Sequence, residues 1–324
     1  MKTTAIIVTY GNRYCYVRQV VEVLLTFNLH GIVIVNNNSV KESSDALHAL
    51  SEKNSLIKLI NLNRNTGSAY AVSRGIDMVL NDPESGYIWL LDDDNLPYPD
   101  AYDTLLENMR TELQKNKHHE IIISLLRDNR QNYVNAVKKS TNDSIIGKKN
   151  IFRSFHIVGL FTSKADNDES IVKGDVSAVP YGGMFFHKNV IEQIGFPDDR
   201  YYLYCDDFDY CCRHLANGGR IILSLESGIE DIERSWNVKG SALKNIASGG
   251  DLFKIYYSVR NRVYLEKKYL ITSWIMYIFN MLIYSALVTL IAVANLKFRN
   301  IKIYYNAVYH GLTGKMGYNE KYRL

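Results

Sequence analysis

Short apolar runs alternate with helix-spaced apolar positions over the first 95 residues of the chain. The runs that predict strands are 3–9, 32–35, 57–62 and 86–91. The stretches that predict helices between them are 17–25, 44–51 and 68–80. Strands that alternate with helices through short connections favour an α/β fold with a Rossmann-like, doubly wound and mostly parallel sheet. In such a sheet, ligands bind beyond the carboxyl ends of the strands.

Three carboxylates directly follow the fourth predicted strand. Its apolar residues 87–91 show no alternation, which is typical of a strand covered on both faces, and Asp92, Asp93 and Asp94 come next. Adjacent carboxylates are driven toward protonation unless a cation lies among them. Mg²⁺ and Mn²⁺ take such oxygen ligands and fill their other positions with substrate phosphates. A solvated acidic turn is the simpler alternative, but the buried strand before the triad and the turn 95–99 after it favour a metal site.

Polar loops follow all four predicted strands. These loops are 10–13, 36–39, 63–67 and 92–95. Because the carboxyl ends of parallel strands share one edge, the loops predict a pocket with hydrogen-bond donors for a base and a ribose, and with a metal for a diphosphate. Arg64 and Arg74 could add positive charge against phosphate. An exposed helical position for Arg74 is an equal alternative.

A second informative block lies between residues 181 and 213. Gly182 and Gly183 precede an apolar run, which suggests backbone that passes close to a ligand or another strand. A helix that begins near Asp206 would place Asp207 in its first turn and allow Asp209 to pair with a residue one turn later. Acidic residues at a helix start stabilise it by about 0.3–1 kcal/mol, so a structural account exists. A general base needs a carboxylate near the reacting hydroxyl, and Asp207 is our candidate.

The segment 270–296 contains no charged residue and is long enough to span a bilayer. A long buried helix is the alternative. Basic residues flank both ends of this segment, at 267–268 and 297–302, and the positive-inside rule would keep both ends in the cytoplasm. A re-entrant or in-plane hairpin fits these charges better than a simple crossing, and a lipid surface is an expected partner. The connections 138–150 and 163–174 lack periodicity, and we expect irregular, mobile loops there.

Bulk composition limits the remaining possibilities. The 324 residues allow one large domain or two ordinary ones, and the net charge of +4 gives no nucleic-acid footprint. The four cysteines form neither a zinc pattern nor a disulfide framework, which predicts a reducing compartment. The N-terminus enters a strand without the apolar region of a signal peptide. We therefore expect the protein at the cytoplasmic face of the cell (inner) membrane.

Several motifs in order along the chain carry a family resemblance. They are Ile6-Ile7-Val8-Thr9-Tyr10, Val35-Asn36-Asn37-Asn38-Ser39, Asn65-x-Gly67 with Arg74-Gly75, Leu91-Asp92-Asp93-Asp94, Tyr181-Gly182-Gly183, Asp207-x-Asp209-x-x-x-Arg213 and Tyr256-Tyr257-x-x-Arg260-Asn261. Over about residues 3–265 the chain resembles the inverting glycosyltransferases of family 2, which have the GT-A fold. The triad and the stretch 65–75 are most similar to the branch of galactofuranosyltransferases and rhamnosyltransferases that builds bacterial cell-surface glycans.

The resemblance implies a role for each matching position. Asp92 and Asp94 would hold Mn²⁺ or Mg²⁺ or contact the ribose and diphosphate, Asp93 would face the donor sugar, and Asp207 would deprotonate the acceptor. The donor pocket would be lined by Thr9, Asn12, Asn36, Arg64, Asn65, Gly67, Arg74, Asp92 and Asp93. The acceptor side would include Gly182, Gly183, Asp206 and Asp209. A metal-binding His is common in the family after a later strand, and Asp231 stands there as a substitute oxygen ligand.

The resulting hypothesis is an inverting, metal-dependent transfer of a sugar from a nucleotide diphosphate sugar to a hydroxyl of a lipid-linked glycan. UDP-galactofuranose is the first expected donor and dTDP-rhamnose the second. A glycosyltransferase domain would occupy 1–265, divided near residue 120 into donor and acceptor halves, with a hydrophobic membrane-associated tail at 266–324. A metal-dependent sugar nucleotidyltransferase and a non-catalytic membrane-bound partner in glycan assembly are the alternatives.

Overall fold

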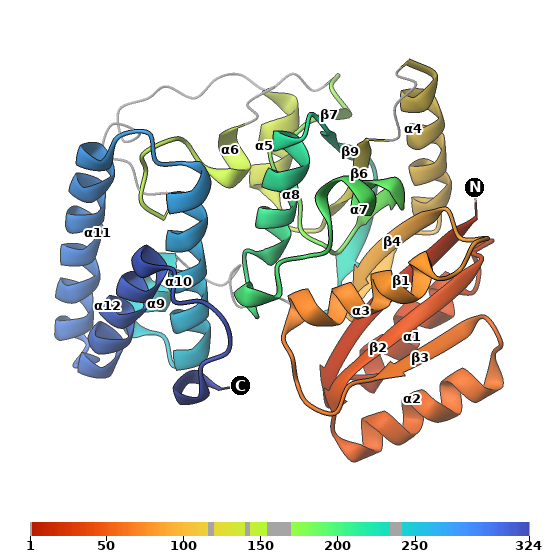
Figure 1. Ribbon diagram of the computed structural model, residues 1–324, viewed down its shortest axis with the longest axis horizontal. Helices are drawn as coiled ribbons and strands as arrows, with labels where there is room; N and C mark the ends of the chain where they lie inside the picture. The colour runs from red at the N-terminus through yellow and green to blue at the C-terminus, as the bar shows by residue number, and fades with distance from the viewer. Residues whose placement is uncertain (1, 116–119, 140–142, 154–169, 234–241, 324) are drawn as a thin grey trace.

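The computed structural model describes residues 2–115, 120–139, 143–153, 170–233 and 242–323. A mixed sheet flanked by helices forms one side of the molecule, and a group of helices near the C-terminus forms the other (Figure 1). The strands are β1 (Thr3–Gly11), β2 (Gly31–Ser39), β3 (Ile57–Asn61), β4 (Tyr87–Asp92), β5 (Asn95–Pro97), β6 (Ile121–Arg127), β7 (Lys173–Asp175), β8 (Met184–His187) and β9 (Arg220–Asp231). The helices beside the sheet are α1 (Tyr14–Leu24), α2 (Lys41–Lys53), α3 (Ser68–Leu80), α4 (Ala101–Lys115), α5 (Gln131–Lys138), α6 (Asp143–Ile146), α7 (Asn189–Ile194) and α8 (Asp206–Ala216).

The strand order is β3-β2-β1-β4-β8-β6-β9-β5, and β7 pairs with β9. Strands β1 to β4 are joined by parallel pairings, as the alternating pattern predicts. Because β8 is antiparallel to both β4 and β6, and β9 is parallel to β6, six of the nine strands in the described residues run one way. The expectation of an α/β, mostly parallel sheet is therefore confirmed, and the antiparallel strand β8 lies in its middle.

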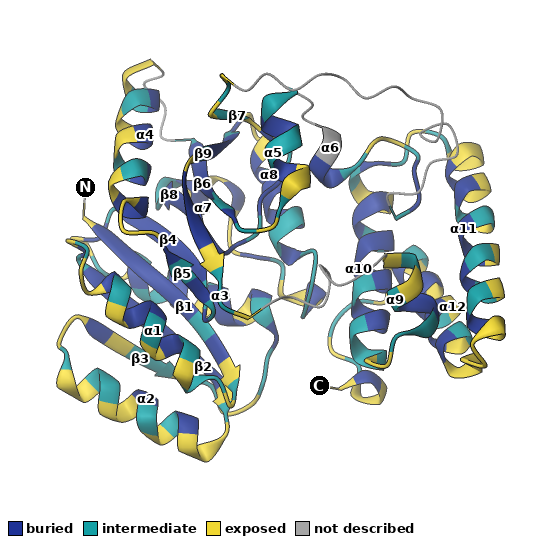
Figure 2. Ribbon diagram, turned by 180° about the vertical axis from the view of Figure 1, so that it is seen from behind, coloured by how far each residue is buried: buried dark blue, intermediate teal, exposed yellow. Residues whose placement is uncertain are grey.

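Helices cover both faces of this sheet. Alternate residues of β1 point to opposite faces, so Ile6 belongs to the core that includes residues of α3, α5, α7 and α8, whereas Ala5 and Ile7 belong to the core that includes residues of α1, α2 and α4. Residues on both faces are apolar and buried (Figure 2), which explains the unalternating sequence of the strands. Gly75 lets α3 approach closely, because a Cβ there would lie 2.4 Å from Ile6 Cγ2. Each fully buried aliphatic side chain contributes about 1.5–3 kcal/mol to this packing.

A third core holds the helical group together. Its helices are α9 (Ala242–Ser248), α10 (Leu252–Tyr269), α11 (Trp274–Ala294) and α12 (Phe298–Thr313). Fully buried tyrosines fill this core, including Tyr256, Tyr257 and Tyr304. Helices α9 and α10 pack against α11 and α12. The domain limits expected from the sequence, 1–265 and 266–324, stay a prediction.

The two irregular connections differ in part from expectation. Residues 143–146 form α6 inside the first connection, which α5 (Gln131–Lys138) enters only at residue 138, and β7 begins at residue 173 near the end of the second. Residues 147–150 and 170–172 are irregular, as expected. Short polar helices of this kind lack a strong apolar period, because only Tyr133, Ala136 and Val137 of α5 face the core. The rest of the expectation, at 140–142 and 163–169, lies outside the described residues.

Candidate active site

Carboxylates from two strand ends meet at one edge of the sheet. Asp92 ends β4 beside Val8 of β1, and Asp231 ends β9 opposite Asn95 of β5. The Asn95 side chain joins the two groups: its amide nitrogen donates to Asp231 Oδ1 at 3.0 Å, and its oxygen accepts from the Asp92 backbone N–H at 3.0 Å. The predicted cluster of acids at the sheet edge is thus present.

Arg13 neutralises the middle carboxylate of the triad. Asp93 is buried, and its oxygens accept from Thr9 Oγ1, Arg13 Nε and Arg13 Nη2, each at 2.8 Å. The same guanidinium lies 3.2 Å from Asp94 and also bonds Glu233. Both oxygens of Asp93 are bonded within the protein, so Asp93 orders the loop, and Thr9 donates its hydroxyl to the same carboxylate. The expected contacts of Asp93 and Thr9 with the donor stay predictions.

Arg127, at the end of β6, bridges the remaining acids. Its Nη1 donates to Asp92 Oδ2 at 2.8 Å, and its Nε donates to Asp231 Oδ1 at 2.8 Å. Gly182 makes room for this bridge, since a Cβ there would lie 2.0 Å from Asn95 Oδ1, 2.9 Å from Arg127 Nη1 and 3.0 Å from Asp92 Oδ2. Although burial alone would lower it, the carboxylates of Asp92 and Asp231 raise the pKa of Arg127 above its usual range. Gly183 has φ of +108°, and its N–H donates to the Leu90 carbonyl at 2.8 Å, so Gly183 serves a close approach of two backbone segments, whereas Gly182 makes room for side chains. The expected contact of both glycines with the acceptor stays a prediction.

Asp206 and Asp207 begin α8 on the other side of the same region. Burial, partly opposed by a hydrogen bond from Ser68 Oγ at 2.7 Å, raises the pKa of Asp206 to about 6. Burial and the neighbouring charge of Asp206 raise the pKa of Asp207 to about 8. Two smaller effects act on the pKa of Asp207: the charge of Asp92 raises it, and the charge of Arg127 lowers it. The triad and the predicted base therefore interact electrostatically.

The loops after β2 and β3 are fastened together by asparagine side chains. Asn36 is buried: its Nδ2 donates to Ser44 and Asn61, and its Oδ1 accepts from the Ser39 N–H. Asn36 therefore orders these loops, and its expected contact with the donor stays a prediction. Asn37, which the sequence did not single out, accepts from the Thr66 N–H at 2.8 Å and donates to the Gly67 carbonyl at 3.1 Å. The described donor-side loops are therefore prearranged.

Other predicted donor residues occupy this edge with different exposure. Asn65 Oδ1 accepts from the Gly67 N–H at 3.0 Å, and Asn12 Oδ1 accepts from Ser43 at 3.0 Å. Arg64 is exposed on its loop. Arg74 lies on the outer surface of α3 and pairs with Asp77 at 3.0 Å, which matches the exposed alternative.

Asp209 is separated from this edge. Its side chain is fully buried, and its oxygens accept from Arg213, Lys268, Tyr269 and Tyr201 at 2.8–3.2 Å. The predicted pairing with Arg213 is present. Because protein donors surround the carboxylate, it joins α8 to α10 and offers no oxygen to an acceptor.

Comparison with known proteins identifies the family. The sequence profile described as Glycosyl transferase family 2 matches residues 4–165, half of the chain. The chain belongs to glycosyl transferase family 2. None of the curated proteins compared with it matches in sequence.

Solved structures agree with the fold of this family 2 chain. The crystal structure of GalNAc-T7 with UDP, GalNAc and Mn²⁺ is similar with a TM-score of 0.56 at 14% identity, over 82% of this chain. This chain spans about half of that protein, 48% of its length. Two structures of S. aureus TarS 1–349, one in complex with UDP-GlcNAc, give TM-scores of 0.46 and 0.48 at 10% and 11% identity over 97% of this chain and 92% of theirs, too low to support an argument. The GT-A-like fold is thus confirmed.

A divalent cation fits two of the three carboxylates expected to bind it. Burial, and then the charges of Asp92 and Asp93, raise the pKa of Asp94 to about 7, so negative charge at Asp94 is under-compensated. Asp231 does not fit: its Oδ1 accepts from Arg127 and Asn95, and its Oδ2 lies 3.7 Å from Arg130. Within the described ranges, no three His, Cys, Asp or Glu side chains are arranged as a ready metal cage. We therefore assign Asp231 to holding Arg127, and keep Asp92 and Asp94 as candidate ligands.

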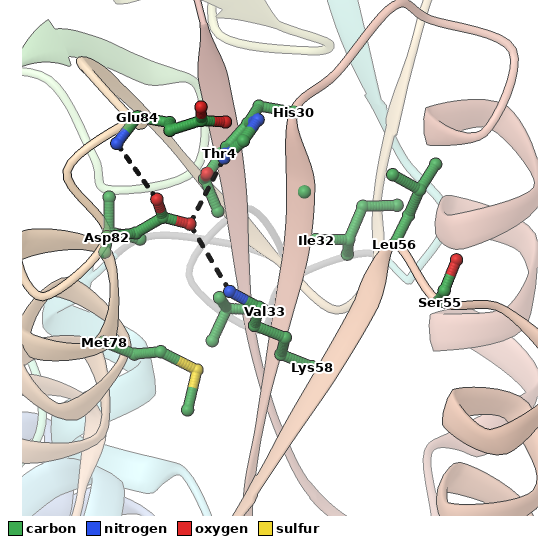
Figure 3. A pocket seen from close by; sticks show the side chains of 12 residues that line it. Thr4, His30, Ile32, Val33, Ser55, Leu56, Lys58, Met78, Asp82 and Glu84 are labelled. Carbon is green, nitrogen blue, oxygen red and sulfur yellow. Dashed lines mark hydrogen bonds and ion pairs between the residues drawn. The ribbon is translucent and has the colours of Figure 1, made fainter.

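A cavity of about 270 Å³ lies at the opposite end of the sheet (Figure 3). It is lined by the starts of β1 and β2, and Asp82 there bonds His30 at 3.2 Å and Lys58 at 3.4 Å. Ligands of doubly wound sheets bind at the carboxyl edge, so the acid cluster and not this cavity is the candidate site of the family 2 chain.

Three arginines complete the site and were missed from the sequence. Arg13 lies in the first polar loop, 10–13, which was identified from the sequence only as one of four polar loops. Arg127 and Arg130 follow the apolar run 121–126, and a charged residue at the end of a buried strand is the signal that had identified Asp92. Arg127 could therefore have been identified from the sequence. Its pairing with Asp231 could not, because the two residues are 104 positions apart.

Proposed function

We propose that this family 2 chain is an inverting glycosyltransferase that moves a sugar from a nucleotide diphosphate sugar to a hydroxyl group. The observation that carries the proposal is that the triad and the start of α8 lie at the same edge of the sheet. Asp92 ends β4, and Asp206, next to Asp207, accepts at 2.7 Å from Ser68 Oγ at the start of α3, directly after the loop that follows β3. Inversion by single displacement needs one base opposite the leaving group. The reaction also needs positive charge that offsets the negative charge of the departing diphosphate. A metal at the triad and a separate carboxylate at Asp207 would meet these two needs.

Asp207 is the proposed base. Its pKa of about 8 is raised by burial and by Asp206, so it lies near neutral pH, where a general base works best. The N–H of Phe208 donates to Asp207 Oδ1 at 2.8 Å and fixes the carboxylate, so the second oxygen is the one to take the proton of the acceptor.

Asp92 and Asp94 are the proposed protein ligands for Mn²⁺ or Mg²⁺. When bound, the ion would offset negative charge on the diphosphate. Arg127 stays on Asp92 and Asp231 and limits the negative charge of the loop. The GalNAc-T7 structure with UDP and Mn²⁺ supports a metal and a uridine nucleotide by analogy of fold.

The finer assignment follows the sequence resemblance. UDP-galactofuranose is the first donor to test and dTDP-rhamnose the next, with a lipid-linked cell-surface glycan as acceptor. A cytoplasmic location at the inner membrane agrees with the exposed apolar face of α11, where Ile275 is 83% and Leu290 is 66% exposed. A sugar nucleotidyltransferase is the second candidate. Arg13 favours it, because a basic residue in the first loop is a feature expected of that class.

The decisive experiment incubates the purified full chain and its Asp207→Asn variant with a panel of nucleotide sugars, Mn²⁺ and a lipid-linked acceptor. We expect Asp207→Asn to lower kcat by about 10²–10⁴-fold. Its affinity for the nucleotide diphosphate should change by less than about 3-fold, because Asp207 is not in the donor loops. Transfer at the wild-type rate would remove Asp207 from the mechanism. Release of pyrophosphate from a nucleoside triphosphate and a sugar phosphate would instead identify a nucleotidyltransferase.

A further inference from the structure

The segment that leads into α8 has an unusual backbone. Just before Asp206, the residues Tyr202, Tyr204 and Cys205 have φ of 65°, 68° and 63°. Residues with a Cβ are disfavoured in this left-handed region, and each costs about 1–3 kcal/mol. Such a conformation persists only where surrounding groups hold it.

Asn261 of α10 stabilises this turn through hydrogen bonds. It is fully buried, and its Nδ2 lies 2.8 Å from the carbonyl oxygen of Tyr201, 2.6 Å from that of Leu203 and 2.9 Å from that of Tyr204. One amide group thus gathers three carbonyl groups of a single turn, which no side chain within the turn does.

Arg260 fixes this amide in turn. Its Nε donates to Asn261 Oδ1 at 2.8 Å, which points Nδ2 at the turn, and its Nη2 donates to the Tyr201 carbonyl at 3.1 Å. The guanidinium lies over the rings of Tyr256 and Tyr257, at 5.3 and 4.8 Å from their centroids. A cation stacked between rings and bonded at both ends has little freedom to move.

The turn is held on its other side by the donor half. The Tyr202 carbonyl accepts from the Ser68 N–H at 2.8 Å, and the Ser68 hydroxyl bonds Asp206. Gly67 permits this contact, because a Cβ on it would lie 1.9 Å from the Tyr202 oxygen. The turn is therefore gripped between the start of α3 and the middle of α10.

We propose that Asn261, oriented by Arg260, is a positioning residue that holds the turn 201–205 in its left-handed conformation and thereby aims Asp207 at the acceptor hydroxyl. The inference rests on the proposed function for its effect on the reaction, but its effect on the turn does not. In this proposal α10 not only packs in the helical group but also sets the position of the Asp207 carboxylate.

A matched variant separates positioning from general stability. Asn300 of α12 is also buried, and its Nδ2 likewise lies 2.9–3.4 Å from three carbonyl oxygens, those of Ile246, Ala247 and Gly249. Asn300→Ala removes the same three contacts from an amide nitrogen to carbonyl oxygens within the same helical group, at a turn that does not precede Asp207. Asn261→Ala removes in addition the bond from Arg260.

The kinetic test compares Asn261→Ala with Asn300→Ala. Both should lower Tm by similar amounts. Only Asn261→Ala should lower kcat, by about 100-fold, with the donor KM within about 3-fold, because misplacement of a reacting group by about 1 Å costs this much. Asn261→Gln, with a longer amide, should recover part of the rate. Equal kcat in the two alanine variants would overturn the proposal, whereas no transfer or donor hydrolysis by the wild type would count against the proposed function alone.

A second test needs no substrate. Burial raises the pKa of the Cys205 thiol to about 12, so it should react slowly with iodoacetamide in the native turn. In a Cys15→Ser background, which removes an exposed thiol, Asn261→Ala should speed alkylation of Cys205 by at least about 10-fold, measured by mass spectrometry of its peptide. Asn300→Ala should leave that rate unchanged. Arg260→Lys loses the bond that orients Asn261 and should speed alkylation of Cys205 in the same way. It replaces Asn261→Ala in this test if Asn261→Ala does not fold. Unchanged alkylation in both the Asn261 and Arg260 variants would refute the role of the clamp.

Discussion

At the scale of single residues, the proposed function depends on neighbouring carboxylates that differ in their surroundings. Asp206 is held by the Ser68 hydroxyl, whereas Asp207 has a backbone N–H and the charge of Asp206 beside it. The Asp207 carboxyl must be ionised to act as a base. Because its pKa is raised to about 8, kcat/KM should rise with pH and level off above that value.

Asp206→Asn tests this electrostatic coupling. The variant removes a negative charge but keeps an oxygen for Ser68, so the ionised form of Asp207 becomes easier to form and its pKa falls. We expect the acidic limb of the kcat/KM profile to move to lower pH by about 1 unit, since two interacting sites couple by at least that much. A limb that does not move would show that Asp206 does not set the ionisation of the base.

Asp207→Asn should also affect stability, with a defined sign. A folded-state pKa of about 8, above the usual value of 3.8, means that the carboxyl stabilises the fold below pH 4 and that this contribution is lost as pH rises through 8. The uncharged variant should therefore match the wild type near pH 4 and melt at a higher temperature near pH 9, by at least about 2 °C in a calorimetric scan. A lower Tm at pH 9 would contradict the raised pKa.

Individual site residues were predictable where the sequence carries local chemistry. Asp92, Asp94 and Asp207 follow or begin a regular element, so their places in the fold were predictable from the sequence, and their roles stay proposals. Asn36, Asp93 and Asp209 were expected to contact substrates. In the structure Asn36 donates to Asn61, whereas Asp93 and Asp209 accept from Arg13 and Lys268. Such pairings depend on tertiary contacts, which no local pattern contains.

At the scale of elements, α11 is the helix whose role the sequence left open. Among the described residues it is the one helix long and apolar enough to cross a membrane, which is weak evidence by itself. Its inner face is bonded to the protein: Tyr277 donates to Glu266 at 3.0 Å and Asn280 to the Asn150 carbonyl at 3.0 Å. Its outer face is apolar and lies at the edge of the molecule (Figure 2). We therefore expect α11 to lie in the plane of a lipid surface rather than to cross it.

Leu282→Glu examines this placement. Leu282 is 61% exposed on α11, and losing a buried leucine from lipid costs about 1.5–3 kcal/mol, so binding to vesicles of phosphatidylglycerol and phosphatidylcholine should weaken by at least about 10-fold. Leu56→Glu, 40% exposed beside β3, is the matched control and should bind as the wild type does. Wild-type protein that resists extraction by alkaline carbonate would instead indicate a crossing helix.

At the scale of the whole molecule, the alternating order of strands and helices was predictable because short connections and unalternating apolar runs leave few arrangements. The central antiparallel strand β8 was not, because its pairing with β4 and β6 joins segments about 60–100 residues apart. The grouping of α9 to α12 was missed as well, since α10 carries charged residues along an otherwise buried helix.

Binding of donor and metal should stabilise the molecule as a unit. At 100 times the dissociation constant, a ligand adds about 2.7 kcal/mol to the free energy of unfolding, which raises Tm by about 5 °C or more. We expect such a shift for the wild type with UDP and Mn²⁺ together, a loss of the shift with EDTA, and none in Asp94→Ala. Asp77→Ala, on the outer surface of α3, should behave as the wild type. A full shift in Asp94→Ala would exclude that carboxylate as a ligand.

The contact between Gly67 and the Tyr202 carbonyl limits how the enzyme can be redesigned. A new side chain at position 67 would meet the carbonyl oxygen of Tyr202, so the segment proposed to face the donor cannot be changed without displacing the segment that leads to the proposed base. Libraries aimed at changing the sugar should therefore vary residues 65–68 and 201–206 jointly, as though they were one loop.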